Sequence, residues 1–502
     1  MRVKPAIFIS IILALSAISA ISAISPLTTK SHAAQSWTLA SLQSQNLNWR
    51  PCDSGFECTQ FKVPFDYSHI DGNTFTIQAI RHRANKPSQR LGSLIMNPGG
   101  PGGSGIEYVL GADSIVSTSI ENAYDLVGFD PRGVNLSQPI RCLSDKQEDY
   151  FLGGNGSVQS AADLSVGLSS AKLMASSCAK VAGSKLAHYS TLDGAKDMEL
   201  LRILLKEAKL NYIGKSYGTY LGTLYAALYP KTIGRMVLDG AVDPNISVRD
   251  QNLAQAAGFD NALKSFISAN PTFSLQQINH FLQTARTKPL RDATKRELSE
   301  SLAVTGIAAS LYDPANGWPL LARALSDAID HKNPGGFLFL ADSYNERDQH
   351  GHYVSNQTDI AEVISCLDFK DPRTLNQIEG DAKSFSAAAP IFGPYLSYSG
   401  LACLYWQAKP VVGPNLNKIA TNPLLVIGTT RDPATPYKWA QGLHKVLLNS
   451  TLITLNGDGH TGANRGSKCV DKAMNTYLLT GKTPLHNLTC DTDAALAHAV
   501  TI

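Results

Sequence analysis

One short segment, NYIGKSYGTYLG at residues 211–222, constrains the possible folds of this chain more than any other. Its letters fit two patterns, because GKS ends a phosphate-binding loop, G-x-x-x-x-G-K-[ST], and also lies inside the nucleophile elbow, G-x-S-x-G. A phosphate-binding loop needs glycine at position 209, where this chain has Lys209, and residues 210–213 are typical of a buried strand. The phosphate-binding interpretation therefore fails at its first glycine.

The nucleophile-elbow pattern fits on both sides of Ser216. Gly214 and Gly218 flank it at the two positions where a strained strand-to-helix turn leaves no room for side chains. An apolar helical segment follows, so the Tyr217 amide lies at the positive end of a helix, where it can receive an oxyanion. The same glycines also suit a plain tight turn that packs a helix on a sheet, so the elbow needs chemical partners elsewhere in the chain.

Apolar segments bounded by Gly, Pro or Asn recur in the first half of the chain. They predict strands at 75–80, 91–97, 124–130, 211–214 and 235–240. Residues 193–208 carry apolar side chains at helical spacing, with Thr191 or Asp193 as N-cap. Strands that alternate with helices predict an α/β fold with a mostly parallel sheet and helices on both faces.

The alternation stops after Pro244 and resumes late in the chain. Residues 246–415 read as mostly helical, and strands return at 423–430 and 450–457, with helices from Pro436 and near 468–480. We therefore expect a core built from two parts, residues 35–245 and 416–502, with a helical cap inserted between two late strands.

The first 34 residues have the composition of a secretory signal peptide. Arg2 and Lys4 precede an apolar segment, and an A-x-A-like cleavage site falls near Ala33 or Ala34. An uncleaved membrane anchor is the alternative, since the apolar stretch continues to Ile24. No later segment approaches the roughly 18–20 apolar residues of a membrane span. We expect a secreted or cell-wall-associated protein with no membrane span after the signal is removed.

The charge balance predicts no nucleic-acid partner. The full chain has 44 basic and 41 acidic residues. The signal segment holds three of the basic residues and no acidic residue, so the mature chain is formally neutral. No clustered basic stripe is visible, whereas nucleic-acid binding needs one.

Eight cysteines follow the signal segment, and an even number in an exported chain favours disulfides. Eight cysteines allow 105 pairings. We expect sequential pairing because each pair then stays within one local region: Cys52–Cys58, Cys142–Cys178, Cys366–Cys403 and Cys469–Cys490. No C-x-x-C occurs, so no metal site is expected.

A serine elbow of this type requires an acid and then a histidine later in the chain. Of the late histidines, His460 alone lies in a glycine-lined loop, GDGHTG, directly after a predicted strand. Asp432 ends the preceding strand. Thr435 is a good N-cap for the next helix with Pro436 at its first position, which would anchor the Asp432 loop.

Other acids compete for the role of Asp432. Asp239 and Asp243 follow the strand after the elbow, and either could partner the histidine. Asp458, two residues before His460, is typical of a turn.

The loop MNPGGPGGSG at 96–105 is the expected source of a second oxyanion donor, because its glycines leave backbone amides bare. Gly100, Gly102 and Gly105 also satisfy G-x-G-x-x-G, which would predict a dinucleotide site with Asp125 or Asp130 as the ribose acid. That alternative leaves the serine, acid and histidine unexplained.

Several segments together resemble a known family: NPGGPGGSG, DLVGFDPRGVNLSQPIRC, YIGKSYGTYLGTLYAALYP, MVLDGAVDP, TTRDPATP and GDGHTG. From about Trp49 to Thr480 the chain resembles secreted tripeptidyl-aminopeptidase-type α/β-hydrolases, relatives of the proline iminopeptidases with a TAP-like C-terminal region. The resemblance implies the α/β-hydrolase fold and a serine exopeptidase with no cofactor. It implies Ser216, Asp432 and His460 as the catalytic triad.

The resemblance also implies that Gly100 and Tyr217 supply the oxyanion amides, although Asn97-Pro98 stands where that family's H-G-G-P-G has histidine. Members also act as esterases or proteases, so a carboxylesterase is the alternative function. A non-catalytic binding protein of the same fold is a remote alternative.

Peptide substrates with a free N-terminus require a carboxylate at a fixed distance from the nucleophile. Candidates are Glu107, just after the glycine loop, and Glu362 and Asp368, on either side of Cys366. Each could equally be an ordinary surface acid or helix cap. The sequence gives no indication of the oligomeric state.

Overall fold

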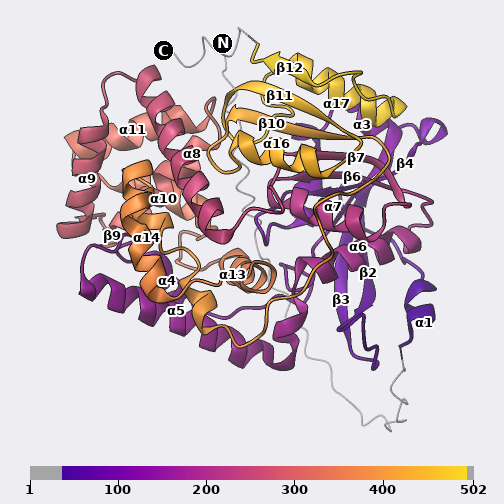
Figure 1. Ribbon diagram of the computed structural model, residues 1–502, viewed down its shortest axis with the longest axis horizontal. Helices are drawn as coiled ribbons and strands as arrows, with labels where there is room; N and C mark the ends of the chain where they lie inside the picture. Colours follow the sequence, from indigo (N-terminus) through magenta and orange to yellow (C-terminus); the bar gives the residue numbers. More distant parts are fainter. Residues whose placement is uncertain (1–36, 494–502) are drawn as a thin grey trace. The chain divides into compact units, whose positions relative to one another are not determined.

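A ten-stranded sheet forms the centre of the fold in the computed structural model, which describes residues 37–493 (Figure 1). The predicted signal peptide lies outside the described residues. The sheet strands are β1 (Arg50–Asp53), β2 (Phe56–Pro64), β3 (Thr74–His82), β4 (Gly92–Asn97), β5 (Tyr124–Phe129), β6 (Leu210–Lys215), β7 (Ile233–Asp239), β10 (Leu424–Arg431), β11 (Ser450–Asp458) and β12 (Leu488–Asp491).

The strand order is β1-β2-β3-β5-β4-β6-β7-β10-β11-β12. The neighbours from β5 to β12 are all parallel, whereas β1, β2 and β3 add an antiparallel edge. The predicted mostly parallel sheet is therefore confirmed. The sequence did not predict β1, β2 or β12, because these strands, at or next to the edges of the sheet, mix exposed and polar residues and lack a continuous apolar run.

Helices cover both faces of the sheet, as the alternating pattern predicted. One face packs against α1 (Leu39–Gln43), α5 (Ala161–Ala182), α6 (Thr191–Leu204), α7 (Tyr217–Leu228) and α16 (Tyr437–Val446). The other packs against α2 (Gly105–Leu110), α3 (Thr118–Ala123) and α17 (Lys468–Thr480). The remaining helical elements of this part of the chain are α4 (Asp145–Leu152), η1 (Pro87–Gln89), η2 (Ala112–Ser114) and η3 (Gly183–His188).

Two predicted helix caps are wrong. Ser190, rather than Thr191 or Asp193, caps α6, and its hydroxyl accepts the Asp193 amide at 3.2 Å. Pro436, rather than Thr435, precedes α16, because the Thr435 hydroxyl is directed to an acid in its own loop.

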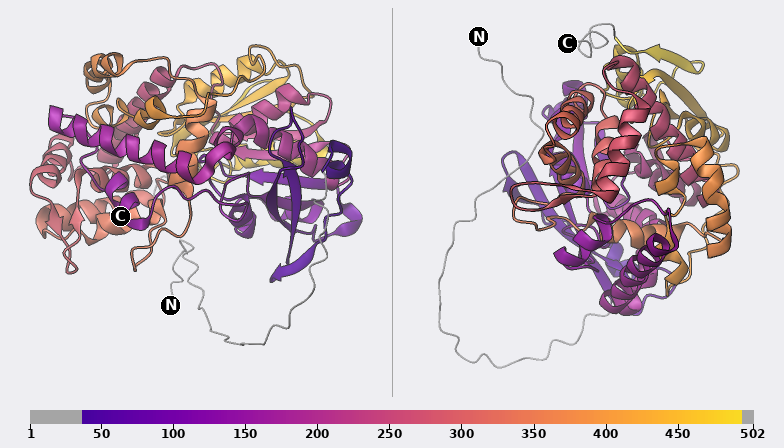
Figure 2. Two further views of the ribbon diagram at one scale, coloured as in Figure 1. Left: turned by 90° about the horizontal axis from the view of Figure 1, so that it is seen from below. Right: turned by 90° about the vertical axis from the view of Figure 1, so that its left-hand side faces the viewer.

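A helical segment follows β7 and ends before β10 (Figure 2). It contains α8 (Val248–Ala269), α9 (Leu275–Thr287), α10 (Glu300–Leu311), α11 (Gly317–Asp330), α12 (Gly335–Asn345), α13 (Gln357–Asp368), α14 (Leu375–Ala388), α15 (Gly393–Leu396) and η4 (Leu401–Tyr405). A two-stranded hairpin, β8 (Leu290–Arg291) with β9 (Glu297–Leu298), was not predicted. Most of these helices share a hydrophobic core of their own. The role of residues 246–415 as a cap stays a prediction.

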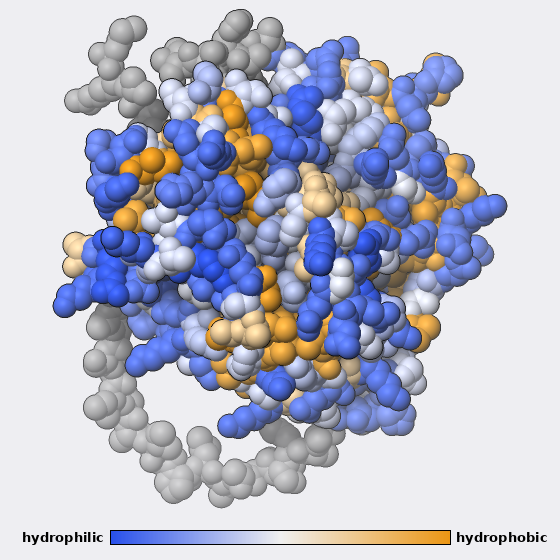
Figure 3. Space-filling model, turned by 60° about the vertical axis from the view of Figure 1, so that its left-hand side comes forward, coloured by the Kyte–Doolittle hydropathy of each residue, from blue (hydrophilic) through white to orange (hydrophobic). Residues whose placement is uncertain are grey.

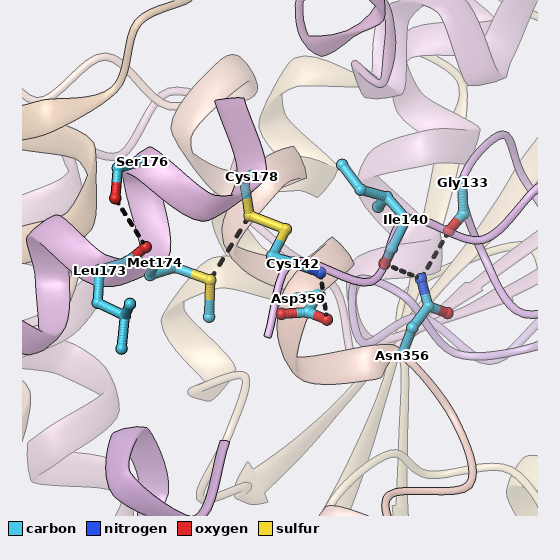
Figure 4. The surroundings of a disulfide bond; sticks show 9 residues. All are labelled: Gly133, Ile140, Cys142, Leu173, Met174, Ser176, Cys178, Asn356 and Asp359. Carbon is cyan, nitrogen blue, oxygen red and sulfur yellow. Dashed lines mark hydrogen bonds between the residues drawn. A yellow bond between two sulfur atoms is a disulfide. The ribbon is translucent and has the colours of Figure 1, made fainter. Parts of the chain in front are cut away.

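Helix α13 attaches this helical segment to the core beside a disulfide (Figure 4). Asn356, at its start, donates to the carbonyls of Gly133 and Ile140 at 2.8 and 2.7 Å. Asp359 accepts the Cys142 amide at 2.8 Å. The structure joins the cysteines in the expected sequential order, as Cys52–Cys58, Cys142–Cys178, Cys366–Cys403 and Cys469–Cys490.

Among residues 37–493 no helix combines the length and apolar character needed to cross a membrane. On the face drawn in Figure 3, apolar side chains form separate groups between hydrophilic ones.

Candidate active site

The elbow predicted at Ser216 is present at the end of β6. Ser216 adopts φ 55° and ψ −127°, and α7 begins at the next residue. Such a conformation costs a non-glycine residue on the order of 1–3 kcal/mol, so the surrounding packing must enforce it. A Cβ at Gly214 would lie 2.4 Å from the Gly218 carbonyl oxygen, and one at Gly218 would lie 2.7 Å from Asn97 Oδ1. Only glycine fits at these two positions.

The glycine-rich loop after β4 lies directly against this turn. A Cβ at Gly99 would lie 2.9 Å from the Tyr217 nitrogen and 2.5 Å from the Lys215 carbonyl oxygen. Gly99 and Gly100 have φ of 95° and 112°, which only glycine adopts without strain. The Gly99 amide donates to Asn97 Oδ1 at 3.0 Å. Asn97 therefore holds the loop that carries Gly100.

A buried histidine–aspartate pair lies at the ends of β10 and β11. His460 Nδ1 lies 2.9 Å from Oδ1 and 3.0 Å from Oδ2 of Asp432. The same carboxylate accepts the amides of Ala434, Thr435 and Thr461 at 2.8–3.0 Å, and the Thr435 hydroxyl at 3.0 Å. With the acid only 2% exposed, these donors compensate its burial and fix its orientation.

The competing acids occupy other positions. The Asp239 carboxylate accepts the amides of Gly462 and Ala463 rather than the imidazole. Asp243 accepts the Asn245 amide at 3.0 Å. Asp458 ends β11 in an ion pair with Arg431 at 2.8 Å and is not the turn residue that its sequence context suggested.

Ser216 and the His460 imidazole both lie beside the end of β7. The Ser216 amide donates to the Asp239 carbonyl at 2.9 Å, and a Cβ on the next residue, Gly240, would lie 3.4 Å from His460 Cε1. The structure records no hydrogen bond between the two side chains themselves, among the residues that it describes. Catalytic hydrogen bonds are commonly long in ligand-free enzymes.

The segment between α10 and α11 also contacts His460. The His460 amide donates to the Tyr312 carbonyl at 2.9 Å, and the two rings meet edge to face with centroids 5.0 Å apart. Arg465, in the same loop as the histidine, pairs with Asp313 at 3.1 Å. The sequence did not indicate this contact, because nothing in a loop pattern specifies which distant segment covers it.

A partly buried polar network reaches the hydroxyl of Tyr217. Asp368 accepts the Thr191 amide at 2.9 Å and also the Thr191 hydroxyl, which in turn contacts the Tyr217 hydroxyl. Burial raises the pKa of Asp368 to about 7. A cavity of about 20 Å³, large enough for one water, is lined by Tyr217, Thr191, Gly99 and other residues of the glycine loop.

The other two candidate N-terminus acids lie apart from this network. Glu362 is half-buried on α13, its carboxylate within 4.8 Å of the sulfur atoms of Cys366 and Cys403, and burial raises its pKa to about 7. Glu107 is exposed on α2 and accepts the Asn135 side-chain amide at 3.1 Å. Desolvation, with the nearby Glu346 carboxylate, raises the pKa of Glu107.

A serine at the strand-to-helix turn of a mostly parallel, helix-covered sheet, with this strand order, defines an α/β-hydrolase. A family model described as TAP-like protein matches residues 389–490. The serine protease Hip1 of Mycobacterium tuberculosis is 33% identical over 489 residues, covering 89% of this chain and 91% of that protein. Carboxylesterase B of the same organism is 34% identical, covering 86% of each chain. Tripeptidyl aminopeptidase of Streptomyces lividans is 30% identical, covering 88% of this chain and 86% of that protein.

These relatives are similar over most of their length, and the chain belongs to this TAP-like family of serine hydrolases.

Proposed function

We propose that this protein is a serine exopeptidase that releases short peptides or amino acids from free N-termini, with Ser216, His460 and Asp432 as its catalytic triad. The observation that carries the proposal is the pairing of His460 Nδ1 with a fully hydrogen-bonded, buried Asp432, beside the strained elbow at Ser216. Similarity to a tripeptidyl aminopeptidase and to a serine protease supports a peptide as substrate.

In the proposed reaction His460 accepts the Ser216 proton as the serine oxygen attacks a peptide carbonyl. Asp432 orients the imidazole and stabilises its charged form. The amides of Gly100 and Tyr217 donate to the tetrahedral oxyanion. Neither amide has a protein acceptor among the described residues, and both belong to segments in mutual contact. The imidazolium then protonates the leaving amine, and water repeats the sequence on the acyl-enzyme. No cofactor or metal takes part.

Recognition of a free N-terminus needs a carboxylate near the acyl pocket. Among the three candidate acids, Asp368 has the strongest support, because its network reaches the residue next to the nucleophile. Glu362, on the same helix, and Glu107, beside the glycine loop, are the alternatives. An ammonium group bound beside Asp368 would favour its ionised form.

The test is a series of p-nitroanilide peptides of one to three residues, each with a free and with an acetylated N-terminus. We expect the free substrates to be hydrolysed at least tenfold faster than the blocked ones, and Ser216→Ala to abolish both rates. Equal rates for free and blocked peptides would contradict an exopeptidase.

A carboxylesterase is the second candidate function, supported by the similarity to carboxylesterase B. Short p-nitrophenyl esters measured beside the anilides separate the two, because an esterase would turn over the esters and leave every anilide intact. A non-catalytic protein would hydrolyse neither class. The four disulfides also support the proposal that the chain works outside the cytosol, as the predicted signal peptide requires.

A further inference from the structure

Asp239, the last residue of β7, lies between the two strands that lead to the elbow and to the acid loop (Figure 1). It is paired in register with Lys215 of β6 on one side and with Ile427 of β10 on the other. Its main-chain carbonyl accepts the Ser216 amide at 2.9 Å. The backbone of Asp239 therefore supports the strained residue that carries the nucleophile.

The side chain of the same residue holds the loop that follows the histidine. The Asp239 carboxylate is fully buried, and its two oxygens accept the amides of Gly462 and Ala463 at 2.7 and 3.0 Å. These amides come directly after Thr461, whose φ of 69° turns the chain away from His460. One residue is thus bonded to both segments that must meet for the reaction.

The charge of Asp239 is balanced by Lys215, the residue before the nucleophile. Lys215 Nζ lies 3.7 Å from Asp239 Oδ2 and donates to the Ala463 carbonyl at 3.2 Å. The elbow pattern, G-x-S-x-G, places no demand on this position. The structure assigns it a contact with both the acid and the histidine loop.

The other charged and titratable groups around this pair are few. Burial lowers the pKa of Lys215, and the Asp239 carboxylate opposes this change. The nearby Arg465 lowers the pKa of Lys215 further, whereas Asp471 raises it. The buried hydroxyl of Tyr108, on α2, has no hydrogen-bond partner among residues 37–493, and burial together with the Asp239 charge raises its pKa. A buried carboxylate held by two amides and one ammonium loses stabilisation sharply when any partner is removed.

We infer that Asp239, with Lys215 as its counter-ion, is a positioning residue that fixes the Ser216 elbow and the His460 loop relative to each other. The inference rests on the proposed triad and goes beyond it, because the residue bonds to both segments and to neither reacting side chain. Since Asp239 bonds to the segments that carry the reacting groups, we expect its loss to act on turnover rather than on substrate binding. Misplacing a catalytic group by about 1 Å costs on the order of 100-fold in rate.

The main test is Asp239→Asn, which keeps the size of the side chain but presents an NH2 group to one of the two loop amides. We expect kcat on the best anilide to fall roughly 100-fold, KM to change less than about threefold, and fluorophosphonate labelling to slow in proportion to kcat. A purely structural role would lower the melting temperature and leave kcat and the labelling rate of the folded enzyme unchanged.

Asp125→Asn is the matched control. Asp125 is also buried, accepts one backbone amide, from Ala84 at 2.9 Å, and pairs with one cation, Arg90 at 2.9 Å. It lies at the start of β5, the opposite end of a strand parallel to β7 within the same sheet. We expect Asp125→Asn to lower the melting temperature with kcat within about twofold of wild type.

Lys215→Met tests the inference if Asp239→Asn does not fold. It leaves both loop amides on Asp239 but removes the cation, so kcat should fall about tenfold with KM retained. Wild-type kcat in a folded Asp239→Asn, or in Lys215→Met when the first variant does not fold, would overturn the inference. If Ser216→Ala remained active, the proposed triad itself would fail, whatever the result at Asp239.

Discussion

Asp432 and Asp239 end neighbouring parallel strands, and both are almost fully buried, yet they contact different parts of the site. Asp432 contacts the imidazole itself, with every other lone pair occupied by amides and the Thr435 hydroxyl. Within the described part of the chain, the Asp239 carboxylate accepts hydrogen bonds only from backbone amides and pairs with Lys215. One carboxylate is placed to orient a reacting ring, and the other is placed to hold the chain that carries it.

This comparison shows why two acids with similar sequence contexts are not interchangeable. Both follow an apolar strand at the same edge of the sheet, so either could have partnered a histidine. The difference comes from the turn after each acid. Two amides of the loop after Asp432 donate hydrogen bonds to its carboxylate. The amides that donate to Asp239 in the described structure come from the distant His460 loop.

The largest effect is expected from Asp432→Asn, which reverses the hydrogen bond to His460 Nδ1 and favours the wrong imidazole tautomer. By analogy with other triads, kcat should fall about 10⁴-fold, well beyond the loss expected for Asp239→Asn. Steady-state kinetics on one anilide, with circular dichroism to verify folding, measures both variants together. An equal loss of kcat in Asp432→Asn and Asp239→Asn would contradict the different roles assigned to the two carboxylates.

A smaller effect is expected from Thr435→Val, which keeps the shape of the side chain and removes its hydrogen bond to Asp432 Oδ2. Four other donors remain on the acid, so kcat should fall about tenfold, the value of one hydrogen bond to a charged group. Thr435→Ser keeps the hydroxyl and should restore most of the rate. If Thr435→Ser lost as much kcat as Thr435→Val, the methyl group of Thr435 and not its hydrogen bond would be responsible for the effect.

The smallest effect is expected on the pH dependence of stability in Asp368→Asn, because this carboxylate is half-buried and accepts hydrogen bonds from the Thr191 amide and hydroxyl. Its pKa of about 7 in the folded protein lies above the ordinary value of 3.8, so the folded state holds a proton that the unfolded state releases. Asp368 therefore stabilises the fold below about pH 4, and this contribution is lost as pH rises to about 7.

Melting temperatures measured between pH 4 and 8 test whether stability falls with rising pH, as expected. Glu148 and Glu362 have pKa values raised in the same direction, so Asp368→Asn should make the decline with pH shallower rather than abolish it. An unchanged or steeper decline would mean that Asp368 is ionised in the folded protein at neutral pH.

Local patterns were enough to predict most of the core of the fold. Strand–helix alternation predicted the parallel sheet, and the elbow glycines predicted the turn at Ser216, because each depends on residues close together in sequence. The edge strands β1, β2 and β12 were missed because they lack a buried apolar run.

The contacts between distant segments could not be predicted. Three contacts join residues that are not related by any helical or strand periodicity in the sequence. They are the contact of Tyr312 with His460, the hydrogen bond from Thr191 to Asp368, and the ion pair of Lys215 with Asp239. Thr435 was predicted as a helix cap from its local preference, but the buried acid three residues earlier competes for the same hydroxyl.

The central claim is that Ser216 is the nucleophile activated by His460. Incubation with a fluorophosphonate, followed by peptide mapping by mass spectrometry, tests it most directly. We expect one adduct per chain, on the peptide that contains Ser216, with His460→Ala reacting at least 1,000-fold more slowly and Ser216→Ala not at all. An adduct on any other residue, or labelling that persists in Ser216→Ala, would contradict it.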